Sequence, residues 1–265
     1  MIIGTSPALC SFIRMPIVPN SVVPPSNIRA SSDYARTALG NDFLAMLSSH
    51  EAETFSRLKA DLEGFKLNVG AVLQHSGIPI THVYFPTSGV VSCAVPLEED
   101  RKVTTYIIGH DGAVNIDPEC GDRAYFTCIV EISGYALGLR SETWRAALRQ
   151  SSGLCRQVAG YLYRQVVQSQ QMVACNVAHD VESRLCRWLL RLHDYSDRSM
   201  IAVTHQSLAR LMSVRRTTVT LVARGLHDAG IIRYRRGQIE VLDRYALETA
   251  ACECHEAAST RLEAV

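Results

Sequence analysis

Two kinds of hydrophobic spacing divide the chain near residue 140. Between residues 65 and 140, short runs of β-branched and aromatic residues are separated by Gly and Pro at intervals of about ten residues, which is typical of an antiparallel barrel or sandwich. The polar stretch Glu98–Arg101 between two such runs predicts a hairpin tip. Upstream, Asn41 before the apolar residues that start at Phe43 predicts a capped short helix, and Glu51–Leu62 predicts a second one.

From Ser141 onward the spacing becomes helical. The pattern is interrupted at Ser151-Ser152-Gly153 and resumes to about Cys175. In this second piece a narrow stripe recurs at spacings of 3, 4, 3, 4 and 3 residues: Ala159, Leu162, Val166, Ser169, Val173 and Asn176. Such a stripe is typical of a coiled-coil seam, so we expect a dimerisation helix. The alternative is an amphipathic helix that packs on its own β domain.

A further helix is expected to begin at Asp180. Its buried face would consist of apolar residues at helical spacing, namely Val181, Leu185, Trp188, Leu189 and Leu192. Its exposed face would carry Arg184, Arg187 and Arg191. A linker is expected from Tyr195 to Ser199.

The next segment has the spacing of a helix-turn-helix. Thr204 predicts the N-cap of a helix over His205–Met212, and a second helix is expected at about Arg215–Asp228. Alternation through Ile231–Val241, around Arg235-Arg236-Gly237, predicts a hairpin that makes the domain winged. The expected fold class is therefore α+β, with an antiparallel β domain, a long helix and a C-terminal winged helix-turn-helix.

The start of the second helix carries residues that suit DNA recognition better than helix stability. Arginine pairs with guanine edges in the major groove, and threonine binds phosphates or base edges and offers a methyl group to thymine. The candidates for this role are Arg215, Arg216, Thr217, Thr218 and Thr220. Arg235 and Arg236 at the wing tip suit phosphate contacts. The alternative is a winged helix that binds protein.

Charge is distributed unevenly along the chain. The segment from Ala178 to Ile239 has 11 Arg, no Lys and 5 Asp or Glu, a net charge of +6 in a protein of net charge +1. Such a basic segment is typical of a nucleic-acid-binding domain. No apolar run is long enough for a membrane span and no signal peptide is recognisable, so we expect a cytoplasmic protein. No nucleophile–base motif, P-loop or HExxH sequence occurs, so we do not expect an enzyme.

Nine cysteines are spread along the chain. An odd count without a signal peptide argues against a disulfide framework, and no CxxC pair occurs. Cys252-Glu253-Cys254 followed by His255 is too little to define a metal site. We expect reduced, structural thiols and no metal, with a redox or metal role as the alternative.

Over residues 40–254 the chain resembles the Crp/Fnr superfamily of bacterial transcription regulators. The resemblance rests on His82–Ser92 (HVYFPTSGVVS), Ala174–Leu190 (ACNVAHDVESRLCRWLL), the start of the recognition helix (VRRTTVT) and Gly230–Arg244 (GIIRYRRGQIEVLDR). It implies an N-terminal antiparallel β-roll of the cyclic-nucleotide-binding type, a dimer helix and a homodimer on a palindromic DNA site. RNA polymerase is a further expected partner.

The β-roll departs from members of that superfamily that bind cyclic nucleotides. Val114 and Asn115 stand where a Gly-Glu pair is expected, and Arg123-Ala124 is the only remnant of the phosphate-binding pair. Asn115 and Arg123 are therefore the only candidates for ligand binding in this region. Cyclic nucleotide response is the alternative to an unknown small-molecule effector.

No cofactor is expected. The oxygen-sensing members of the superfamily hold an iron–sulfur cluster with N-terminal cysteines, and here only Cys10 precedes the β-roll. The histidines in or near the roll, His75, His82 and His110, leave haem as an alternative.

The sequence thus predicts a dimeric, sequence-specific DNA-binding transcription regulator of Crp/Fnr type. We expect a flexible extension over 1–35, a β-roll domain over 36–140, a helical linker with the dimer helix over 141–177 and a winged helix-turn-helix domain over 178–265.

Overall fold

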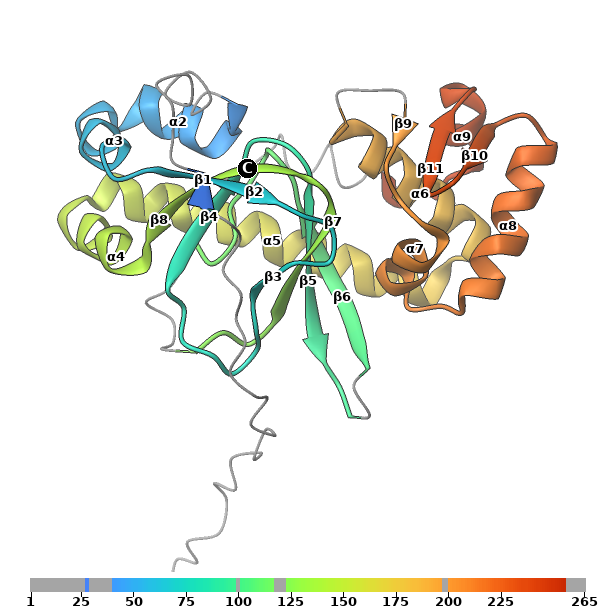
Figure 1. Ribbon diagram of the computed structural model, residues 1–265, viewed down its shortest axis with the longest axis horizontal. Coiled ribbons are helices and arrows are strands. Elements are labelled where there is room, and N and C mark those ends of the chain that lie inside the picture. Colours follow the sequence, from blue (N-terminus) through green and yellow to red (C-terminus); the bar gives the residue numbers. More distant parts are fainter. Residues whose placement is uncertain (1–26, 29–39, 99–100, 117–122, 197–199, 256–265) are drawn as a thin grey trace, which may run out of the picture.

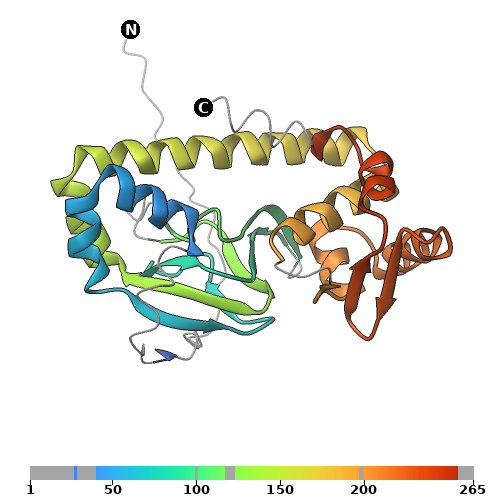
Figure 2. The same cartoon turned by 90° about the horizontal axis from the view of Figure 1, so that it is seen from above.

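The computed structural model describes residues 27–28, 40–98, 101–116, 123–196 and 200–255. A β domain and a winged-helix domain lie side by side, and the long helix α5 (Ser152–Ala178) runs past both of them (Figure 1). The two domains lie on the same side of α5 (Figure 2). The expected α+β class and order of parts are confirmed.

The β domain consists of two antiparallel four-stranded sheets. One has the order β1-β2-β8-β4 and the other β3-β7-β5-β6. The strands are β1 (Asn27–Ile28), β2 (Glu63–Leu67), β3 (Val72–Gln74), β4 (His82–Pro86), β5 (Val90–Pro96), β6 (Lys102–Ile108), β7 (Thr127–Ile132) and β8 (Gly134–Arg140). The predicted hairpin around residues 98–101 is confirmed by the pairing of β5 with β6.

The predicted N-terminal extension lies mostly outside the described residues. Within it, the structure describes only Asn27–Ile28, which pair with Phe65 and Gly64 as strand β1. These two residues pair with the edge of β2 that is not paired with β8.

Short helices cover one end of the β domain. They are α2 (Asp42–His50), α3 (Ala52–Lys59) and α4 (Ser141–Gln150). Asn41 caps α2 as predicted, with its side-chain oxygen accepting from the Leu44 amide at 3.1 Å. Its amide nitrogen donates to Pro86 O and Gly112 O, each at 2.8 Å. Asn41 thus ties the start of α2 to the β domain.

Helix α6 (Val181–Asp194) begins close to the expected position, with Asp180 as its N-cap, but its arginines are not on an exposed face. Arg184 and Arg187 are buried, and Arg191 is half-buried. Arg184 Nη2 donates to Met212 O at 2.7 Å, and Arg187 stacks over the ring of the neighbouring Trp188. The prediction is wrong because the arginine side of α6 is covered by α5 and by the helix-turn-helix.

The winged-helix domain has the predicted elements and two further ones. Helices α7 (His205–Met212) and α8 (Arg216–Asp228) form the helix-turn-helix, and β10 (Ile232–Arg235) and β11 (Gln238–Val241) form the wing. The sequence did not reveal β9 (Met200–Ile201), which pairs with β11, or α9 (Arg244–Ala250), which packs against α6.

The winged-helix domain is packed against the β domain. Val90, Ile107 and Ile132 of the β domain share an apolar cluster with α6, α7 and α8. Arg210 on α7 pairs with the buried Glu131 on β7, with 2.9 Å between Nη2 and Oε2. Among the described residues, no helix is long and apolar enough to cross a membrane.

Candidate nucleic-acid interface

The turn of the helix-turn-helix fixes where α8 begins. Ser213 ends α7 in the left-handed conformation, with φ 54°, and the Val214 amide donates to Ala209 O at 3.0 Å. Ala209 has a small side chain and is buried in the apolar cluster that α7 and α8 share. Arg215 is the N-cap residue with an extended backbone, and it provides no side-chain cap.

The predicted contact residues lie together on the first turn and a half of α8. Arg215, Arg216, Thr217 and Thr220 are exposed, and Thr218 is half-buried. The side chains of Arg215 and Arg216 form no hydrogen bond or ion pair with any residue that the structure describes. Two adjacent guanidinium groups are thus presented to solvent at the end of a helix that lies at the outer edge of the molecule (Figure 1).

The wing presents a second pair of cations. Arg236 and Gly237 form the turn, with φ values of 42° and 80°, and Arg235 pairs with Gln238 across it. Arg235 and Arg236 are exposed, and within the described chain neither side chain has a hydrogen-bonding or ion-pair partner. By contrast, Arg233, which lies two residues before Arg235 in β10, is paired with Glu240 at 3.0 Å.

A shallow groove of about 310 Å³ separates the start of α8 from the wing. His205, Arg216 and Tyr234 line it, and His205 Nδ1 lies 3.1 Å from Thr220 Oγ1. Burial, and then the positive charge of Arg216, lowers the pKa of His205, which favours the neutral imidazole. His205 and Tyr234 were missed in the sequence, since neither belongs to the basic pattern.

Each of the two predicted ligand residues of the β domain makes a contact within the protein. Asn115 is buried with φ 60°, and its Nδ2 donates to Gln74 Oε1 at 3.3 Å and to His82 O at 3.1 Å. Arg123 is exposed and donates to Gly77 O at 2.7 Å. The structure therefore assigns a local structural contact to each side chain.

Two of the three histidines considered for haem are also held by neighbours. The ring of His82 stacks on Tyr84 with centroids 5.7 Å apart. His110 Nδ1 lies 3.1 Å from Asp42 Oδ2. Burial, followed by the charge of Lys102, lowers the pKa of His75.

Helix-turn-helix, wing and exposed cations together define a winged-helix domain with a basic surface. Residues 183–250 match the family model of the Crp-like helix-turn-helix domain. The chain therefore carries a Crp-like helix-turn-helix domain.

Solved structures show the same overall fold at low sequence identity. FixK2 from Bradyrhizobium japonicum has a TM-score of 0.64 at 14% identity, over 72% of this chain and 98% of that one. A transcriptional regulator of the Crp/Fnr family from Eubacterium rectale has a TM-score of 0.63 at 15% identity, over 82% and 100%. TTHB099 from Thermus thermophilus has a TM-score of 0.60 at 21% identity, over 71% and 98%. The fold is thus that of Crp/Fnr regulators. Among curated proteins, none matches this chain.

Proposed function

We propose that the protein is a sequence-specific DNA-binding transcription regulator of Crp/Fnr type. The observation that carries this proposal is the pair Arg215 and Arg216, exposed and without a partner in the described part of the chain, at the start of the second helix of a Crp-like helix-turn-helix domain. In this fold the N-terminal end of that helix enters the major groove, where arginine reads guanine. The wing arginines add sequence-independent phosphate contacts.

The proposal includes a homodimer formed through α5. One face of α5 is turned away from both domains of its own chain (Figure 2). It carries Val166, Val173 and Val177, which are between 51% and 85% exposed. Apolar residues at this spacing are buried when two such helices pair, and the two copies of α8 would then address a palindromic site.

The dimer is tested by placing charge in the α5 face. The double variant Val166→Glu and Val173→Glu should shift the molar mass in solution from that of a dimer to that of a monomer. Val69→Glu is the matched control, since Val69 is 54% exposed on the β domain. A double variant that stays dimeric would show that another surface holds the dimer together.

The effector is proposed to be a small molecule other than cyclic AMP. Two observations support this: Asn115 and Arg123 make contacts within the β domain, and position 115 is Asn where the resemblance leads one to expect Glu. The proposed units are the extension 1–35, the β-roll 36–140, the helical linker 141–177 and the DNA-binding domain 178–265. RNA polymerase is the proposed protein partner.

Selection of genomic fragments by the purified protein, with and without cyclic AMP, tests the function. Enrichment of a two-fold symmetric sequence without nucleotide is the expected result. Enrichment only with cyclic AMP would favour a nucleotide-responsive regulator and overturn the effector proposal. No enrichment of any sequence under either condition, with a folded dimer, would count against sequence-specific DNA binding.

A further inference from the structure

Four side chains that commonly bind metals meet where the end of α5 approaches the C-terminal end of the winged-helix domain. They are Cys175, His179, Cys252 and Cys254, and their ligand atoms all lie within 4.8 Å of one another. The three cysteines are buried and form an apolar cluster of their own, and His179 is half-buried. Over the described residues, this is the one group of three or more such side chains that could hold a metal ion.

The fold brings together two pairs that are distant in sequence. Cys175 and His179 are four residues apart at the end of α5, so they lie on the same helix face. Cys252 and Cys254 follow α9 in a turn, which the His255 amide closes by donating to Cys252 O at 3.0 Å, and both thiols are buried against α5. The last red segment lies against the end of the yellow helix α5 in Figure 2. This face is not the one that carries the exposed valines.

The distances fit a tetrahedral metal better than a disulfide. Cys175 Sγ lies 3.6 Å from Cys252 Sγ, and Cys254 Sγ lies 3.6 Å from His179 Nδ1. Bonds of about 2.3 Å to Zn²⁺ place the sulfurs of a tetrahedron about 3.8 Å apart. A disulfide needs sulfurs about 2.05 Å apart.

The surroundings orient the ligands as they do in zinc sites. His179 Nε2 lies 3.1 Å from Glu253 Oε1, which leaves Nδ1 directed at the cysteines. A carboxylate on the outer nitrogen of a metal-bound histidine fixes the ring and increases its basicity. Gln171 Nε2 also donates to Cys254 Sγ at 2.9 Å, a contact that stabilises a thiolate ligand.

Buried charge near the cluster provides an independent argument. Arg184 and Arg187 are 8% and 4% exposed, and neither is paired with a carboxylate in the described part of the chain. Buried cations are normally paired. Zn²⁺ with three thiolates and one neutral imidazole carries a net charge of −1, which would offset part of the positive charge of these two guanidinium groups.

We propose that Cys175, His179, Cys252 and Cys254 form a Zn²⁺ site that fastens the end of the DNA-binding domain to the end of the dimer helix. The three thiol protons leave to solvent as the ion binds, and no electron transfer is involved. The site spans the junction between α5 and α6 at His179 and Asp180. Binding therefore restrains how the winged-helix domain is oriented on α5.

Metal analysis of the full-length protein is the direct test. Protein purified under reducing conditions should contain about one zinc ion per chain. The Cys252→Ser and Cys254→Ser double variant should lose it, whereas Cys155→Ser should keep it, because Cys155 is exposed and outside the cluster. Zinc loss should also lower the melting temperature of the wild-type protein when a chelator is added.

Cobalt replacement keeps the test valid if the double variant is poorly folded. Co²⁺ added to zinc-free wild-type protein should produce thiolate charge-transfer absorption and the intense visible bands of tetrahedral cobalt. His179→Gln should alter the visible bands while thiolate absorption remains. Wild-type protein that binds neither Zn²⁺ nor Co²⁺ at about one ion per chain, or that is isolated with a Cys175–Cys252 disulfide, would overturn the proposal. None of these readouts depends on DNA binding.

Discussion

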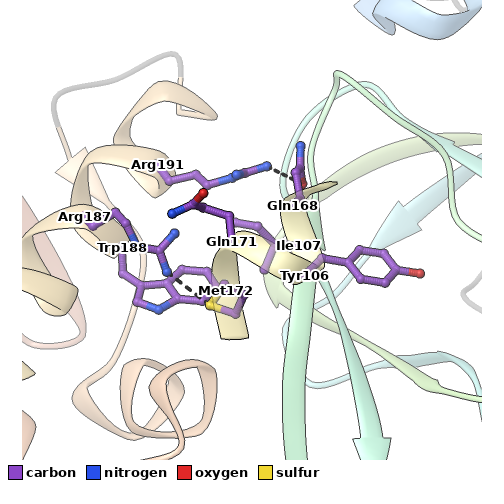
Figure 3. A pocket seen from close by; sticks show the side chains of 8 residues that line it. All are labelled: Tyr106, Ile107, Gln168, Gln171, Met172, Arg187, Trp188 and Arg191. Carbon is purple, nitrogen blue, oxygen red and sulfur yellow. Dashed lines mark hydrogen bonds between the residues drawn. The ribbon is translucent and has the colours of Figure 1, made fainter. Parts of the chain in front are cut away.

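Two sets of arginines in the same basic segment behave in opposite ways. Arg184 and Arg187 on α6 are buried and contact Met212, Met172 and Trp188 (Figure 3 shows the latter contacts of Arg187). The other set, on α8 and the wing, is exposed and makes no side-chain hydrogen bond or ion pair to a described residue: Arg215, Arg216, Arg235 and Arg236.

The difference shows that net charge overstates the surface available to DNA. All of these residues contribute equally to the charge of the segment, but burial removes the α6 arginines from any interface. Arg191 shows the same effect, since it donates to Gln168 Oε1 at 2.8 Å (Figure 3). Accessibility and lack of a partner, rather than charge, separate arginines that support the fold from arginines available to a ligand.

The largest effect on function is expected from Arg216→Ala. A bidentate arginine–guanine contact is worth about 1–3 kcal/mol, and a dimer loses two of them, so specific affinity should fall at least about 30-fold. The melting temperature should stay close to that of the wild type, because the side chain is exposed. Titration of the selected DNA fragment, together with thermal unfolding, measures both quantities. Retained specific affinity in a folded variant would show that α8 does not read the site.

Arg184→Ala should produce the reverse result. The substitution leaves the buried Met212 carbonyl at the end of α7 without its donor at 2.7 Å, which costs about 1–3 kcal/mol of unfolding free energy. Denaturant unfolding should show this loss, while the fraction that remains folded binds the same DNA sequence as the wild type. Arg224→Ala is the control, since its ion pair with Asp228 is exposed and has 3.7 Å between charged atoms. Equal stability of the two variants would contradict a structural role for Arg184.

The comparison also shows what the sequence could predict. Periodicity and caps located α2, α5, α7, α8 and the wing, because these signals lie within a few residues of each other. The burial of Arg184 depends on Met212, which is 28 residues away. Single-sequence periodicity does not detect such contacts, and a helix buried on nearly all sides looks amphipathic when arginines occupy one face.

The residues of the candidate nucleic-acid interface also fall into two groups: those that local sequence spacing reveals and those that only the fold brings together. The exposed residues at the start of α8 follow from local helix-turn-helix spacing, so they could be named from the sequence. His205 and Tyr234 join the groove only through folding of the wing beside α7. The Cys175 cluster was missed for the same reason, since Cys252 lies 77 residues further along the chain. The segment Cys252–Cys254 was the only local signal.

The smallest effect is expected from the wing. Replacing Arg235 and Arg236 with Ala should weaken binding to all DNA sequences alike, because phosphate contacts carry no sequence information. The slope of log affinity against log salt concentration should become less steep, by the amount that corresponds to about two phosphate contacts per chain. Arg57→Ala on α3 is the control, being exposed and on the β domain, and it should leave the slope unchanged. A wing variant with the wild-type slope would mean that the wing arginines, although exposed and unpaired among the described residues, do not contact the DNA backbone.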